Sequence, residues 1–142
     1  MKYYKFYLLI AILPLFFIFP FSARSQPSAS DESDSKIVLV QAVLCEDIQE
    51  NRPKNQTTVF SIERRKAFFF TAFDPVPQQT VIYHNWFFRD RPVAKIKLTL
   101  KPPRWSTYSS IQLRAEDIGP WRVEIADSQG NIFRVLRFSI TE

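Results

Sequence analysis

The chain has 142 residues, enough for one domain with its own hydrophobic core, and 46% of them are hydrophobic. The formal net charge is +5, but 3 of the 19 basic residues lie in the first 25, and the other 16 stand against 14 acidic residues, a balance of +2. This near neutrality, without a long basic run or an aromatic–basic ribonucleoprotein motif, excludes a nucleic-acid partner.

Residues 1–25 have the pattern of an export signal. Two lysines near the start precede an uncharged apolar run at residues 6–21, and a tripeptide with small residues at both ends closes at Ser25. The alternative is a membrane anchor, but a spanning helix needs about 20 apolar residues, and this run is shorter and contains two prolines. We expect cleavage before Gln26 and an exported protein, periplasmic or secreted, that meets a membrane only if the segment stays uncleaved.

Residues 26–35, QPSASDESDS, contain no large apolar residue that a core could bury. This composition is typical of a disordered polar linker. The single cysteine, Cys45, cannot form an internal disulfide, so packing must stabilise the domain that follows. Because Cys45 ends the apolar run 37–45, we expect a small core residue rather than a nucleophile.

From residue 36 onward, short apolar stretches alternate with turn signals at a spacing of about ten residues. The pattern predicts strands, in chain order, at residues 36–45, 57–62, 67–73, 80–89, 93–101, 104–113, 121–125 and 132–141. A polar loop is expected at residues 46–56, a hairpin turn at 89–92 and a further turn at 127–131. Residues 36–142 should therefore form an all-β domain, an immunoglobulin-like antiparallel β-sandwich of seven or eight strands.

Alternation within two of these strands indicates which face is buried. In residues 93–101 four apolar side chains fall on one face and three lysines and a threonine on the other. In the longest strand, Trp86 fits the position where immunoglobulin-like domains bury a large ring against the facing sheet. The disulfide that often packs there is absent, because the chain has one cysteine.

Three segments combine tryptophan with polar residues: His84-Asn85-Trp86, RWSTYSS at residues 104–110, and GPWRVEI at residues 119–125, with Gly130 and Phe138 behind them. In order and spacing they resemble the bacterial family known as domain of unknown function 2914, from about residue 38 to residue 140. Two details differ from that family: Arg104 precedes Trp105 rather than following it, and Arg91 stands in place of a turn glycine. The resemblance implies an envelope domain without an assigned activity.

His84 is the only histidine, and its ordinary pKa lies close enough to neutrality for acid–base or ligand chemistry. By alternation it shares a face with Ile82, Trp86 and Phe88, so we expect a buried ring hydrogen-bonded at both nitrogens, with a serine of the 109–110 pair as a candidate partner. A zinc or copper site needs more ligands than one histidine and one cysteine. No metal and no cofactor are therefore expected.

Residues 104–110, within the predicted strand 104–113, form the most polar strand segment of the domain. Alternation separates Trp105, Thr107, Ser109 and Ile111 from Arg104, Ser106, Tyr108 and Ser110. The second set would line a groove with a cation and three hydroxyls, suited to a carboxylate or a sugar. The alternative is an edge strand that hydroxyl groups keep soluble.

A hydrolase triad can be written with Ser109 or Ser110, His84 and Asp117, but no Gly-x-Ser-x-Gly elbow surrounds either serine. We therefore predict a non-enzymatic module that binds a protein partner or a cell-envelope glycan. The alternative is a small-ligand sensor or enzyme that uses His84 and the strand at residues 104–110, and a third hypothesis is a structural spacer. The candidate binding residues are His84, Arg104, Tyr108 and Ser110, and no catalytic residue is assigned.

Overall fold

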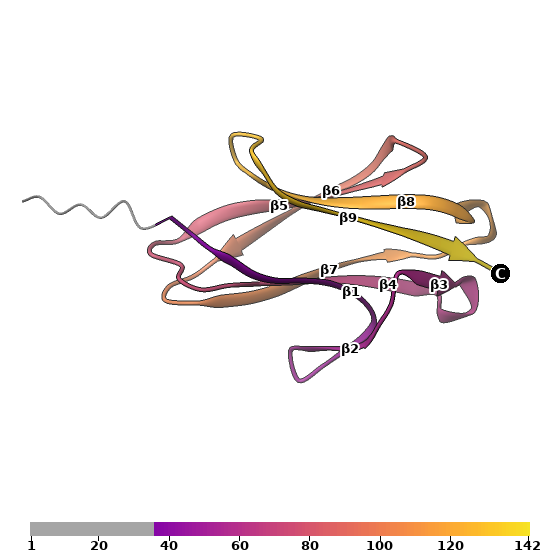
Figure 1. Cartoon of the computed structure of the whole chain (residues 1–142), viewed down its shortest axis with the longest axis horizontal. Helices are drawn as coiled ribbons and strands as arrows, with labels where there is room; N and C mark the ends of the chain where they lie inside the picture. The colour runs from indigo at the N-terminus through magenta and orange to yellow at the C-terminus, as the bar shows by residue number, and fades with distance from the viewer. Residues whose placement is uncertain (1–35) are drawn as a thin grey trace, which may run out of the picture. The chain divides into compact units, whose positions relative to one another are not determined.

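The computed structural model describes residues 36–142, and these form two β-sheets packed face to face (Figure 1). The predicted signal peptide at residues 1–25 and the predicted linker at residues 26–35 lie outside the described residues. Within residues 36–142 there is no helix with the length and apolar character needed to cross a membrane.

The described part of the chain contains nine strands and two short 3-10 helices. The strands are β1 (Leu39–Gln49), β2 (Arg52–Gln56), β3 (Val59–Ser61), β4 (Lys66–Phe73), β5 (Thr80–Phe88), β6 (Arg91–Leu100), β7 (Trp105–Gln112), β8 (Gly119–Asp127) and β9 (Ile132–Thr141). The helices are η1 (Ile62–Arg64) and η2 (Ala115–Asp117). One sheet has the order β2-β1-β4-β7 and is called the β1 sheet; the other has the order β3-β9-β8-β5-β6 and is called the β5 sheet.

The strand order confirms the immunoglobulin-like sandwich. The run β1-β4-β7 facing β9-β8-β5 reproduces the A-B-E and G-F-C order of that fold. One pair departs from the antiparallel prediction, because β3 runs parallel to β9 with Phe60 opposite Ile140. After β2 the chain leaves the β1 sheet and joins the edge of the β5 sheet, which also raises the strand count above the predicted seven or eight.

The predicted loop at residues 46–56 is wrong: this segment continues β1 and forms the hairpin strand β2. The two strands meet at a turn in which Glu50 and Asn51 have positive φ angles of 49° and 56°. The strand was missed because β2 is an exposed edge, where water solvates the side chains and no apolar alternation is required. An edge also tolerates Pro53, whose backbone has no N–H to donate.

Trp86 is fully buried at the centre of the sandwich, as predicted. Its ring makes T-shaped contacts with the rings of Phe69 from β4 and Phe138 from β9, at centroid distances of 6.1 and 5.9 Å. Such pairs stabilise a core beyond the area they bury. Aromatic packing between the sheets therefore occupies the place where related domains often have a disulfide.

Trp121 fixes the connection between β7 and β8. Its indole Nε1–H donates a 2.7 Å hydrogen bond to the backbone oxygen of Asp117, four residues earlier. In immunoglobulin domains a tyrosine at the start of the corresponding strand bonds to upstream backbone in the same way. Here a tryptophan takes that position and also stacks on Phe138 at a centroid distance of 6.0 Å.

Candidate functional site

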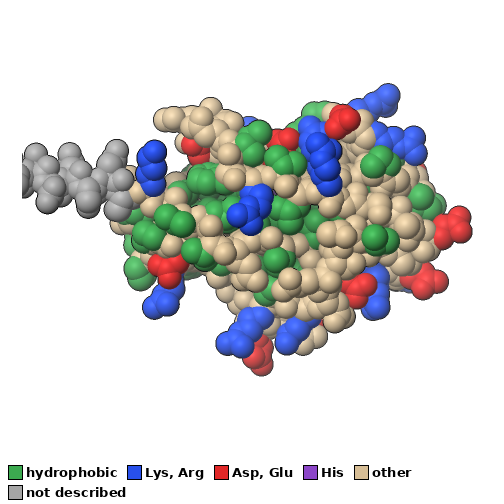
Figure 2. Space-filling view, viewed as in Figure 1, with side chains coloured by type: hydrophobic (Ala, Val, Ile, Leu, Met, Phe, Trp, Pro, Cys, Tyr) green, Lys and Arg blue, Asp and Glu red, His purple; other side chains and the backbone are tan. Residues whose placement is uncertain are grey.

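His84 lies between the two sheets, fully buried, with its ring centroid 4.6 Å from that of Phe69. Its Nδ1 is 2.8 Å from the hydroxyl oxygen of Ser109, and its Nε2 is 3.2 Å from that of Thr71. The expectation of a buried ring bonded at both nitrogens, with a serine of the 109–110 pair, is confirmed. No histidine is visible on the face of the molecule in Figure 2.

The direction of these bonds follows from counting protons. The indole Nε1–H of Trp86 donates to Ser109 Oγ at 3.1 Å, which leaves the Ser109 hydroxyl proton free to donate to His84 Nδ1. His84 then carries its proton on Nε2 and donates to Thr71, whose hydroxyl proton points at the Thr107 carbonyl oxygen, 3.5 Å away. This assignment gives every proton an acceptor, whereas the other tautomer leaves the Ser109 proton without one.

Burial lowers the pKa of His84 to about 3, because the charged ring would lose its hydration inside the sandwich. The ring is therefore neutral at neutral pH and is a weak base. Its bond to Ser109 resembles half of a catalytic triad, but both ring nitrogens are occupied by hydroxyl groups. Asp117 instead accepts a hydrogen bond from the backbone N–H of Arg114 at the β7–β8 connection.

Strand β7 is the edge strand of the β1 sheet and exposes one of its faces. Ser109 and Ile111 point into the core and are buried, whereas the Tyr108 side chain is 45% exposed and its ring contacts that of Phe68 at 6.0 Å. Ser110 is partly buried on the same side as Tyr108. The structure thus brings Arg104, Tyr108 and Ser110 to one outer face and separates them from the buried His84.

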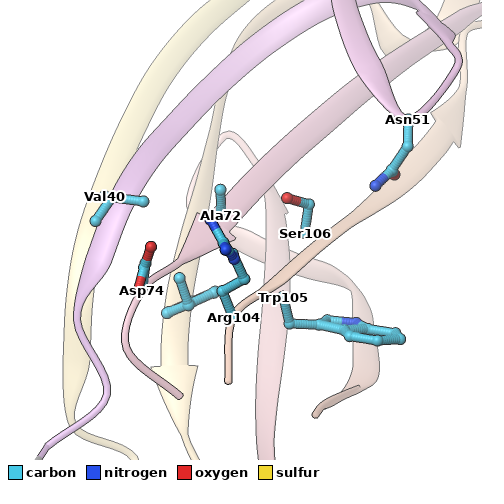
Figure 3. Close-up of a pocket in the computed structure, with 8 residues that line it drawn as sticks. Val40, Asn51, Ala72, Asp74, Arg104, Trp105 and Ser106 are labelled. Atoms are coloured by element: carbon cyan, nitrogen blue, oxygen red, sulfur yellow. The ribbon is translucent and has the colours of Figure 1, made fainter. Parts of the chain in front are cut away.

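A shallow hollow of about 520 Å³ lies on this outer face at the start of β7. It is lined by Val40, Asn51, Ala72, Phe73, Asp74, Arg104, Trp105 and Ser106. Figure 3 shows the Arg104 side chain extending across the hollow near Ala72, with Asp74 on one side and Ser106 on the other. The indole of Trp105 turns away from these groups and packs partly against the core. The hollow therefore combines a largely apolar lining with the polar groups of Asn51, Asp74, Arg104 and Ser106.

Two residues of the hollow were missed by the sequence analysis. Asn51 comes from the β1–β2 turn, and Asp74 directly follows β4. Ala72 of β4 pairs with Ser106 of β7, and this register brings Asp74 beside Arg104. In the sequence, Asn51 lies between polar stretches and Asp74 precedes a proline, and both patterns indicate turns. Neither pattern shows that the two residues lie near Arg104.

Acidic, histidine and cysteine side chains do not converge elsewhere among residues 36–142. No group of three that could hold a metal ion occurs in this part of the chain. Cys45 is fully buried beside β2 and β4 and lies outside the main hydrophobic cluster between the sheets. Burial raises the pKa of its thiol, so it stays protonated near neutral pH.

These features define an all-β, immunoglobulin-like sandwich. It has a buried histidine hydrogen-bonded between the two sheets and a hollow of mixed polar and apolar lining on one outer face. Residues 79–140 match the family model described as "Protein of unknown function (DUF2914)". The match includes the five strands from β5 to β9. It confirms the family resemblance over residues 79–140.

The two other comparisons are with curated proteins and with solved structures. No curated protein matches the chain. Among solved structures, the crystal structure of a selenomethionine-labelled β-glucosidase from Kluyveromyces marxianus is similar, with a TM-score of 0.41 and 12% sequence identity. That match covers 72% of this chain and only 14% of the β-glucosidase chain.

Proposed function

We propose that this chain is an exported, non-enzymatic binding module that holds a cell-envelope glycan on the outer face of its β1 sheet. The observation that carries the proposal is the hollow around Arg104, which lies on the same strand face as the exposed ring of Tyr108. Arg104, Ser106 and Tyr108 follow one another at alternate positions, which lie about 7 Å apart along a strand. Such a row suits an extended ligand.

The side chains of this face match the two kinds of surface that a sugar presents. The half-exposed ring of Tyr108 offers a flat apolar platform for the C–H face of a sugar ring. Asn51, Asp74 and Ser106 supply hydrogen-bond donors and acceptors for hydroxyl groups. Because the hollow is mostly open, it accommodates part of a glycan chain rather than an enclosed small molecule.

Arg104 gives the face a preference for an acidic glycan. Its side chain is exposed, and among the ion pairs of residues 36–142 none involves Arg104, although Asp74 lines the same hollow. A guanidinium group binds a carboxylate through two parallel hydrogen bonds. We therefore expect carboxylated saccharides, such as peptidoglycan fragments, to bind more tightly than neutral ones.

The alternative, a sensor or enzyme that uses His84, has less support. The ring is fully buried, and its pKa of about 3 keeps it uncharged. A ligand could reach it only by separating the sheets. A protein partner on the Tyr108 face remains the competing occupant, and the binding experiment distinguishes it.

The test is thermal unfolding of the purified chain with acidic and neutral oligosaccharides and peptidoglycan fragments. A ligand at one hundred times its dissociation constant adds about 2.7 kcal/mol to the free energy of unfolding, which raises the midpoint by several degrees. Arg104→Ala and Tyr108→Ala should remove the shift. Arg114→Ala is the matched control, because Arg114 is an exposed arginine paired with Glu116 outside the hollow. A shift that survives both site substitutions, or no shift with any saccharide, contradicts the proposal.

A further inference from the structure

Three arginines from three different segments meet at one end of the β5 sheet. Arg89 comes from the β5–β6 turn, Arg122 from β8 and Arg137 from β9, and together they line a small hollow of about 80 Å³. Asp90, Pro120 and Trp121 complete its lining. In Figure 2 basic side chains gather at this end of the molecule, over the β5–β6 turn.

Two of these arginines stand directly opposite each other. In the antiparallel pairing of β8 with β9, Arg122 is the register partner of Arg137. Like charges at directly opposed positions destabilise a sheet, because the two side chains project from the same face at close range. An anion between the guanidinium groups would convert this repulsion into attraction.

Arg122 is held rigidly within the group. Its guanidinium carbon lies 3.9 Å from the centroid of the Phe87 ring, and its Nε donates to Glu124 at 3.1 Å. Asp90 pairs with its Nη1. Because these contacts leave the Arg122 side chain only 18% exposed, it forms a fixed floor for the hollow.

Backbone contacts with Gly119 and Pro120 hold Arg89 in place. Its N–H donates to the carbonyl oxygen of Pro120 at 3.1 Å, which ties the turn to the start of β8. A Cβ atom at Gly119 would lie 3.4 Å from the Arg89 guanidinium nitrogens and 3.3 Å from the Phe88 ring. The missing side chain of Gly119 therefore provides the space in which the Arg89 guanidinium lies.

The positive charge of the hollow is only partly balanced. Among residues 36–142, neither Arg89 nor Arg137 takes part in an ion pair, and both are exposed. The one carboxylate that lines the hollow is Asp90, whose side chain is 84% exposed on the turn. Such a group can turn into water at little cost, which frees the Arg122 Nη1 for another anion.

We propose that this hollow binds a phosphate monoester, with Arg137 and Arg89 contacting its oxygens and the phosphate displacing Asp90 from Arg122. Guanidinium groups match phosphate oxygens in bidentate geometry, and three of them suit a group with two negative charges. The volume equals between two and three water molecules at about 30 Å³ each, which fits one phosphate group. The site lies apart from the Arg104 hollow, so the two proposals stand or fall independently.

The test is calorimetric titration of the full chain with inorganic phosphate at low ionic strength. Arg137→Gln and Arg89→Gln should each weaken binding roughly tenfold, the effect of losing a charged hydrogen-bonding partner. Arg134→Gln is the matched control, because Arg134 is exposed on the same strand but does not line the hollow. Asp90→Asn should tighten binding severalfold, because it removes the competing carboxylate. Glucose 6-phosphate and vesicles containing phosphatidic acid then show whether a sugar or a lipid carries the phosphate.

The outcomes separate clearly. A loss of affinity in Arg137→Gln and Arg89→Gln, with Arg134→Gln unchanged, supports the site, and a gain in Asp90→Asn supports the displacement. If titration of the unsubstituted chain gives no heat of binding, the proposal is overturned. The proposal is also overturned if Arg137→Gln, Arg89→Gln and the control Arg134→Gln weaken binding equally, since that result indicates only general attraction to a basic surface.

Discussion

The hydroxyl oxygen of Ser109 lies 2.8 Å from Nδ1 of His84, and this hydrogen bond joins the two sheets of the sandwich. Ser109 belongs to β7 in the β1 sheet, and His84 belongs to β5 in the β5 sheet. The bond from His84 to Thr71 on β4 makes a second connection of the same kind. A directional polar bridge therefore ties together two layers that have no disulfide between them.

We expect Ser109→Ala to destabilise the domain strongly. The substitution leaves two buried groups without a partner, the indole N–H of Trp86 and the Nδ1 of His84. An unsatisfied buried group costs about 1–3 kcal/mol, so the free energy of unfolding should fall by about 2–4 kcal/mol. Urea denaturation measures the change. Ser110→Ala is the control, because Ser110 is only partly buried and the expected loss is below about 1 kcal/mol; equal losses in both variants would contradict the bridge.

The depressed pKa of His84 predicts a loss of stability in mild acid. The folded ring titrates at a pKa of about 3, whereas the unfolded side chain titrates near 6.5, so the unfolded state binds the extra proton between these values. Stability is fully present above about pH 7 and decreases as the pH falls. Between pH 7 and pH 5 the loss should be about 2 kcal/mol. Chemical denaturation at both pH values, compared with His84→Gln, checks this, since that variant should lose much less over the same interval.

Much of the fold followed from the sequence because its inner strands bury one face. The alternation in residues 93–101 correctly placed β6, with Leu100 buried and Lys95 and Lys97 exposed. The same reasoning placed Trp86 and His84 inside. Burial imposes a period of two on the sequence, and that period is visible without any knowledge of the partner strands.

The features that were missed all depend on long-range pairing or on exposed backbone. Strand β2 lies at an edge where polar residues serve as well as apolar ones, so it left no periodic signal. The approach of Asn51 and Asp74 to Arg104 depends on the β1–β4–β7 order. The opposition of Arg122 and Arg137 depends on the register of the β8–β9 hairpin, which a bulge beside Ile125 shifts.

Gly119 should tolerate substitution less well than Gly130. Both have positive φ angles, 137° and 88°, that other residues rarely adopt. An added Cβ at Gly119 also meets the Phe88 ring and the Arg89 guanidinium, whereas at Gly130 nothing lies within 4 Å. Gly130→Ala should cost about 1–2 kcal/mol from the backbone alone, and Gly119→Ala should cost more and also weaken phosphate binding. Thermal unfolding and phosphate titration of both variants test this, and equal costs would show that the packing over Gly119 yields freely.

The predicted export signal determines where the mature chain should begin. If residues 1–25 are a signal peptide, expression of the full sequence in a secreting bacterial host should yield a product that begins at Gln26, because Ala23 and Ser25 place small side chains just before the cut. N-terminal sequencing and intact mass of the protein from the exported fraction measure this directly. Ala23→Lys is the informative variant, since a long charged side chain at the third residue before the cut should block cleavage and leave the chain attached to the membrane. Ser28→Lys, on the other side of the cut, is the control that should be processed normally. An intact N-terminus in the unsubstituted chain would exclude a cleaved export signal. Full-length protein confined to the cytoplasm would also leave the glycan-binding proposal without access to its ligand.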